Sequence, residues 1–149
     1  MALFEKVNED IKTAMKERDK VALDTLRNIK KVFLEAMTAP GANNTLEDTD
    51  ALKMIQKLAK QGKESAQTYI DAGRQDLADA ELAQVSVIER YLPEQLSEAE
   101  IEKIVKTIIG QTGAASMKDM GKVMGMANKQ LAGKADGKTI SGIVKKLLA

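Results

Sequence analysis

Apolar residues recur along almost the whole chain with the three-to-four-residue spacing of amphipathic helices. The alternation of apolar and polar residues that is typical of strands is absent, so we predict an all-α protein. The expected helices cover about residues 3–17, 20–38, 45–72, 76–91, 97–109, 116–132 and 139–147.

Pro93 marks the expected boundary between two helical subdomains. The residue before a proline disfavours the α conformation, so the helix over about 76–91 ends here. We therefore predict an N-terminal subdomain of about four helices over residues 1–92 and a three-helix C-terminal subdomain over residues 93–149. Ser97 and Glu100 have the spacing of a capping box at the start of the second subdomain.

The composition excludes several kinds of chemistry. The chain has 149 residues and contains neither cysteine nor histidine. It therefore has no disulfide, no imidazole base and no Ser-His or Cys-His nucleophile, and it lacks the ligands that zinc prefers. We expect no catalysis by this chain alone, no metal site and no cofactor.

Positive charge is concentrated near the C-terminus. The formal net charge of the whole chain is only +1. Residues 103–149, however, contain nine lysines against the two acids Asp119 and Asp136, which gives this stretch a net charge of +7. A local excess of this size favours a polyanionic partner for the C-terminal subdomain.

The expected helix over 116–132 carries a lysine face. At about 100° per residue, Lys118, Lys122 and Lys129 lie within roughly 40° of one another. The apolar residues expected on the opposite, core-facing side are Met117, Met120, Met124, Ala127 and Leu131. Gly121 and Gly125 allow close approach of a neighbouring helix or a nucleic-acid backbone. The alternative interpretation is a solvated lysine face with two packing glycines.

A glycine-rich segment over 133–139 carries Lys134 and Lys138. It resembles a P-loop, but only three residues separate Gly133 from Gly137 where the motif requires four, and no strand precedes it. A turn between helices is the better interpretation. Its lysines and backbone N–H groups are still candidates for contact with one phosphate of a larger polyanion.

A second row of lysines lies on the expected helix over 45–72. Lys53, Lys57 and Lys60 follow one another at helical spacing, and Glu64 dilutes the row. Either a polyanion partner or an ordinary solvated helix face explains this pattern. We retain Lys60 as a candidate contact.

Several sequence blocks occur in a characteristic order along the chain. They cover residues 60–65, 72–74, 91–97, 119–125 and 133–137. In these blocks the sequence resembles the YqeY-like (GatB/YqeY) family over essentially its whole length. The blocks add Arg74 to the candidate contacts. The family usually carries a basic residue where this chain has Gly62.

The resemblance implies a fold of two helical subdomains and a relation to the C-terminal tail of the GatB subunit of tRNA-dependent amidotransferases. That tail helps to hold the outer body of tRNA. We therefore predict a non-catalytic tRNA-binding module that makes backbone and shape contacts. Any label of carbon–nitrogen ligase activity with glutamine as amido donor would be inherited from the family. The alternative is a protein-interaction module that docks on an amidotransferase, an aminoacyl-tRNA synthetase or another translation factor.

The first ten residues contain no basic segment followed by an apolar run. Nowhere in the chain are there 18 consecutive apolar residues. From these features we expect a cytoplasmic protein without membrane contact.

Overall fold

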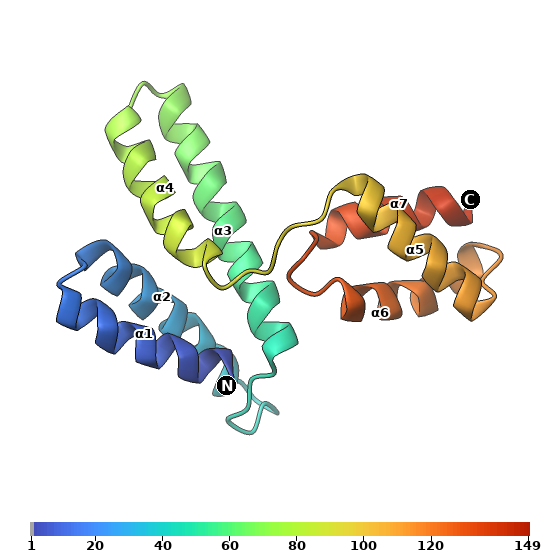
Figure 1. The fold of residues 1–149 in the computed structure, drawn as a ribbon, viewed down its shortest axis with the longest axis horizontal. Coiled ribbons are helices and arrows are strands. Elements are labelled where there is room, and N and C mark those ends of the chain that lie inside the picture. Colours follow the sequence, from blue (N-terminus) through green and yellow to red (C-terminus); the bar gives the residue numbers. More distant parts are fainter. Residues whose placement is uncertain (1) are drawn as a thin grey trace. The chain divides into compact units, whose positions relative to one another are not determined.

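The computed structural model describes residues 2–149, and within this range every regular element is a helix (Figure 1). The all-α prediction is confirmed. The elements are α1 (Leu3–Glu17), α2 (Lys20–Met37), α3 (Asp48–Asp71), α4 (Gln75–Glu89), α5 (Glu98–Thr112), the 3₁₀ turn η1 (Met117–Asp119), α6 (Met120–Gln130) and α7 (Gly137–Leu148). The chain divides into two compact units, and the division falls between Leu92 and Pro93.

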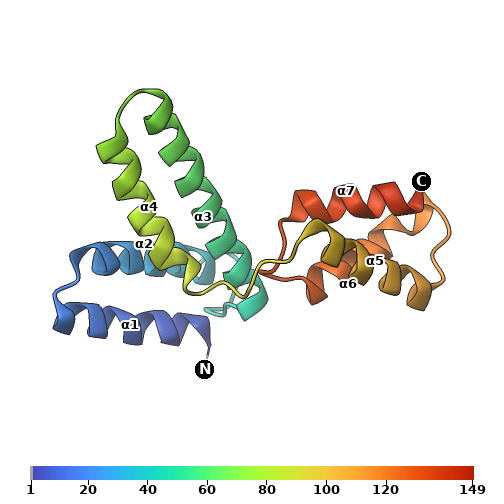
Figure 2. The same cartoon turned by 45° about the horizontal axis from the view of Figure 1, so that its top comes forward.

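The first unit contains two antiparallel helix pairs, α1 with α2 and α3 with α4 (Figure 2). Asp19 caps α2, because its carboxylate accepts a hydrogen bond from the N–H of Ala22 at 3.1 Å. The core between the helices includes the fully buried residues Val7, Ile29, Phe33 and Ile55. The helices pack along their apolar faces, as the periodicity of the sequence predicts.

Gly62 sets the close approach of α3 and α4. A Cβ atom added at this position would lie 2.5 Å from Cγ2 of Val85 on α4. Val85 is itself only 2% exposed, so its side chain has little room to move away. Packing against α4 thus explains why this position of α3 is glycine.

The second unit is a three-helix unit in which α5, α6 and α7 all contact one another. Its core contains Val105, Ile108, Val123, Leu131 and Val144. At the start of α5 the predicted capping box is present. The N–H groups and side chains of the two capping residues bond reciprocally, at 3.2 Å and 3.3 Å.

The start of the predicted helix over 116–132 differs from the expectation. Its first turn is the 3₁₀ turn η1, in which the side chain of Ser116 accepts from the N–H of Lys118. Met117 therefore precedes the α-helical part and is 45% exposed, instead of lying in the core. Val123, which the sequence analysis did not place in the core, is fully buried. No helix of the described residues has both the length and the apolar character needed to cross a membrane.

Candidate nucleic-acid interface

The solvent-facing side of α6 is basic. At about 100° per residue, Lys122, Gly125 and Lys129 lie within an arc of about 60° and are all exposed. The buried residues Val123 and Ala127 lie on the opposite side of the helix, against α5 and α7. The core contacts of α6 thereby fix the direction in which the two lysines point.

Lys118 lies just before α6, in the turn η1, and is also exposed. The turn is held at both ends: Ser116 caps it, and the Asp119 carboxylate accepts from the N–H of Ala115 at 3.1 Å. Gly121 follows in the first turn of α6. A Cβ atom at Gly121 would meet no other atom within 4 Å, and the same holds for Gly125. Packing within the protein therefore does not require glycine at these two positions.

The loop between α6 and α7 carries Lys134. Gly133, in the left-handed conformation with φ 75°, turns the chain here. The loop is fixed from outside, because the Gln95 side-chain amide donates to the Gly133 carbonyl at 2.6 Å and the N–H of Leu96 donates to the Lys134 carbonyl at 3.0 Å. Lys138 follows in the first turn of α7, where its N–H donates to the Asp136 carboxylate.

We call these five lysines of the second unit the basic surface: Lys118, Lys122, Lys129, Lys134 and Lys138. All five are exposed. Within residues 2–149, none of them forms an ion pair, although Lys106 on neighbouring α5 pairs with Glu102 at 3.4 Å. The basic surface therefore presents ammonium groups whose charge is not neutralised by the protein.

Lys60 and Arg74, the other two predicted contacts, belong to the first unit. Lys60 is exposed on α3. Arg74 donates two hydrogen bonds to the carboxylate of Asp76, from Nε at 3.2 Å and from Nη2 at 3.1 Å. This pairing raises the pKa of Arg74 and lowers the pKa of Asp76. The Asp76 carboxylate thus partly neutralises the charge of Arg74, which makes Arg74 a weaker contact for an anionic partner.

Two further lysines, which the sequence analysis did not select, extend along α7. Lys145 and Lys146 lie in its last turn and are exposed. The helical spacing from Lys138 was the available signal, since positions seven and eight residues apart share one side of a helix.

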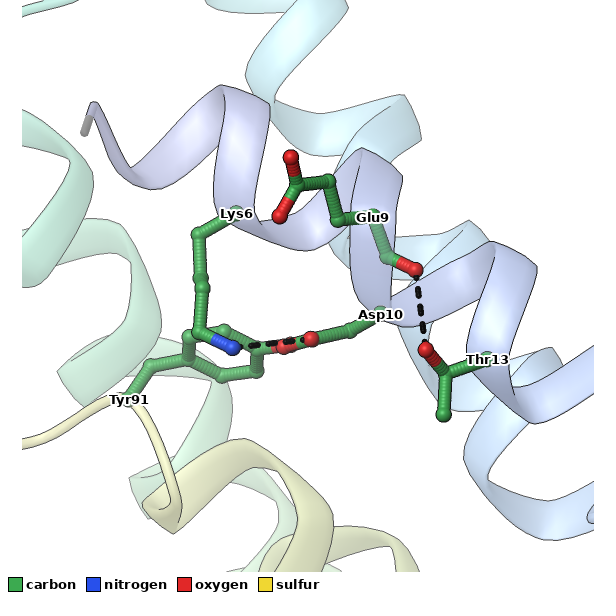
Figure 3. A network of polar contacts seen from close by, with 5 residues as sticks. All are labelled: Lys6, Glu9, Asp10, Thr13 and Tyr91. Atoms are coloured by element: carbon green, nitrogen blue, oxygen red, sulfur yellow. Dashed lines mark hydrogen bonds and ion pairs between the residues drawn. The ribbon is translucent and has the colours of Figure 1, made fainter.

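A partly buried polar contact connects the two ends of the first unit (Figure 3). The Tyr91 hydroxyl donates to the carboxylate of Asp10 on α1, and Lys6 donates to the same carboxylate at 2.9 Å. Burial alone would raise the pKa of Asp10, but the bonds from Tyr91 and Lys6, with the charges of Lys6 and Arg90, together lower it. Burial, with the bond to Asp10, raises the pKa of Tyr91. The Asp10 carboxylate is therefore held in its ionised form, and both of its oxygens accept hydrogen bonds from within the protein. This arrangement is typical of a structural contact.

A surface cavity of about 540 Å³ lies between the end of α2 and the start of α3. Lys53 and Lys57 line it together with the acids Glu47 and Asp50. The charges balance, so the cavity does not select an anion. No group of three or more His, Cys, Asp or Glu side chains suited to a metal ion occurs in residues 2–149.

The fold and the site define the class of this protein: it is an all-helical protein of two units, the second of which is basic. Comparison with known families identifies it further. The family described as Yqey-like protein matches residues 4–148. The chain therefore belongs to the YqeY-like family, as the resemblance predicts.

Two of the curated relatives carry a mitochondrial name. The chain is similar to "Altered inheritance of mitochondria protein 41, mitochondrial" of Pyrenophora tritici-repentis, with 30% identity over 87% of this chain and 71% of the relative. It is also 30% identical to the protein of that name from Meyerozyma guilliermondii, over 86% of this chain and 68% of the relative. An uncharacterised protein of Schizosaccharomyces pombe is 29% identical over 61% of this chain and 72% of the relative.

These relatives overturn the expected cytoplasmic location. The expectation was wrong because it used only the absence of a basic segment followed by an apolar run near residue 1 and of a long apolar segment. Mitochondrial targeting depends on a different signal, an Arg-rich and Ser-rich amphipathic segment that is poor in acids. The features that the argument used therefore do not report on this compartment.

Proposed function

We propose that this protein binds tRNA through the second unit as a non-catalytic accessory module. The observation that carries the proposal is the basic surface, five exposed lysines without ion pairs in the described chain, set opposite a well-packed core. Phosphate groups neutralise such ammonium groups and release condensed counterions, which favours binding. The resemblance to the GatB tail selects tRNA among the polyanions.

The contacts in this proposal are to the RNA backbone and shape. Recognition of single-stranded bases uses aromatic side chains as stacking platforms. The second unit contains no aromatic residue. In the first unit Phe33 is fully buried and the Tyr91 hydroxyl is bonded to Asp10. Base stacking therefore has no surface on the unit that carries the lysines.

The inventory of side chains supports an accessory role without catalysis. The chain contains no histidine or cysteine to act as nucleophile or imidazole base. Both carboxylate oxygens of Asp10 are engaged inside the protein, one by Lys6 and the other by the Tyr91 hydroxyl. We expect no glutamine-dependent amidation of misacylated tRNA by the purified chain, and measurable amidation would contradict this part of the proposal.

The first experiment is a titration of the purified full chain against bulk tRNA and against a DNA duplex of matched length, each at three salt concentrations. We expect a preference for tRNA that persists near physiological salt. Weak, equal and steeply salt-dependent binding to both would overturn the proposal, because any lysine-rich surface binds nucleic acids in this non-specific way. Association with a translation protein that persists after RNase treatment would then favour the protein-interaction alternative.

Substitution locates the contact on α6. The Lys122→Ala/Lys129→Ala protein should bind tRNA more weakly, with a salt slope that is smaller by about 0.7 to 0.9 for each lost phosphate contact. The matched control is Lys103→Ala/Lys106→Ala on α5, which removes the same charge from the same unit and should leave the slope nearly unchanged. Equal effects of the two variants would mean that only net charge matters.

A further inference from the structure

Helix α7 carries basic residues and no acidic one over Gly137–Leu148. At about 100° per residue, Lys138, Lys145 and Lys146 lie within an arc of about 100°, and all three are exposed. The buried residues Ile140 and Val144 face the core from the opposite side. The solvent-facing side of α7 therefore carries three exposed lysines.

Stabilisation of the helix does not explain this distribution. Lysines in the last turn interact favourably with the helix dipole, by about 0.3 to 1 kcal/mol, which would account for Lys145 and Lys146. Lys138, however, lies in the first turn, where the same dipole disfavours a positive charge. Within residues 2–149 no ion pair compensates any of the three. An external anion accounts for all three positions at once.

The lysines of α6 and α7 follow one another around the corner between the two helices. Lys129 lies in the last turn of α6, Lys134 in the loop and Lys138 in the first turn of α7. The loop is fixed by the hydrogen bonds from Gln95 and Leu96. Asp136 is the one acid between Lys129 and Lys138, and its carboxylate accepts a hydrogen bond from the N–H of Lys138 at the start of α7.

We propose that the nucleic-acid contact extends from α6 onto α7, where Lys145 and Lys146 bind phosphates of the same RNA. This proposal rests on the proposed function, which supplies the RNA as the ligand. The negative charge of its phosphodiester backbone is what the lysines of α7 would bind. Gly142 lies between these lysines on the exposed side, and a Cβ atom there would meet nothing within 4 Å. The main chain of α7 is therefore accessible between the cations.

The test is a tRNA titration of Lys145→Ala/Lys146→Ala in the full chain at three salt concentrations. We expect weaker binding and a salt slope that is smaller by about 1.4 to 1.8, the value for two lost phosphate contacts. The control is again Lys103→Ala/Lys106→Ala, with unchanged slope expected. Since loss of the last-turn lysines can loosen the helix end, Lys145→Gln/Lys146→Gln, which retains polar side chains, provides a second variant, and circular dichroism confirms helix content.

The α6 variant separates the two proposals. If Lys122→Ala/Lys129→Ala weakens binding while both α7 variants bind with the wild-type slope, the extension onto α7 is wrong and the proposed function stands. If neither pair affects binding, both proposals are wrong. If the α7 variants lose stability but keep the wild-type slope, the lysines serve only the helix dipole, and the extension is likewise wrong.

Discussion

Replacement of Gly62 by alanine tests the close packing of α3 against α4. The new Cβ would lie 2.5 Å from Cγ2 of Val85, much closer than carbon atoms approach in ordinary van der Waals contact. Val85 is β-branched and only 2% exposed, so it has few rotamers and little space for adjustment. The two helices must therefore separate locally to accept the methyl group.

The magnitude follows from two opposing effects. Overpacking of a core by one methyl group costs about 1 to 3 kcal/mol. Alanine in place of glycine in a helix interior gains about 1 kcal/mol. Gly125→Ala gives the second effect alone, because its Cβ meets nothing within 4 Å. We therefore expect Gly62→Ala to be less stable than Gly125→Ala by about 1 to 3 kcal/mol, each relative to wild type.

The assay can observe the first unit separately. All four aromatic residues of the chain precede Pro93, and there is no tryptophan. Tyrosine fluorescence in a urea titration therefore reports unfolding of the first unit, while far-ultraviolet circular dichroism reports both units. We expect Gly62→Ala to lower the urea midpoint of the fluorescence transition. Gly125 lies in the second unit, so Gly125→Ala should leave that midpoint unchanged. It should raise only the midpoint of the part of the circular dichroism transition that comes from the second unit.

A double-mutant cycle with Val85→Ala completes the test. Without the Val85 methyl groups the added Cβ has space, so Gly62→Ala should become stabilising by about 1 kcal/mol in that background. The packing explanation would be refuted if Gly62→Ala stabilised the wild-type protein as much as Gly125→Ala does. It would also be refuted if Val85→Ala left the effect of Gly62→Ala unchanged.

Three further predictions concern the other contacts. Tyr91→Phe should destabilise the first unit by about 1.5 kcal/mol, because it removes a hydrogen bond to a charged group. The folded pKa of Asp10 is below its unfolded value, so its contribution is full above about pH 4 and is lost as the pH falls through the folded pKa. The urea midpoint measured against pH should accordingly fall less steeply in acid for Tyr91→Phe, and an identical acid dependence in both proteins would contradict this. Ser97→Ala should cost the second unit about 1 kcal/mol in a urea titration, and no loss would argue against the capping box. Gly125→Ala should weaken tRNA binding while it stabilises the fold, whereas equal binding would mean that the RNA does not approach the α6 main chain.

The helices, the capping box at the start of α5 and the lysine side of α6 were predictable from the sequence. These features depend on residues a few positions apart, and the period of 3.6 residues converts such spacing directly into a face. Ser97 with Glu100, and Lys122 with Lys129, are examples. The same spacing would have placed Lys145 on one side of α7 with Lys138. The engagement of Arg74 by Asp76, in contrast, depends on a side-chain geometry that two charged residues near each other in sequence do not specify.

Only the tertiary structure decided the contacts between distant segments. Tyr91 and Asp10 are 81 residues apart, and Gln95 reaches Gly133 across 38 residues. From the sequence alone, Gly62 is a residue that weakens its helix. The structure shows that Val85 of another helix packs against it. Local periodicity shows which side of a helix is apolar, because it follows from the backbone geometry of that helix alone. Which residue of another helix meets that side depends on packing of the whole unit, which no local pattern contains.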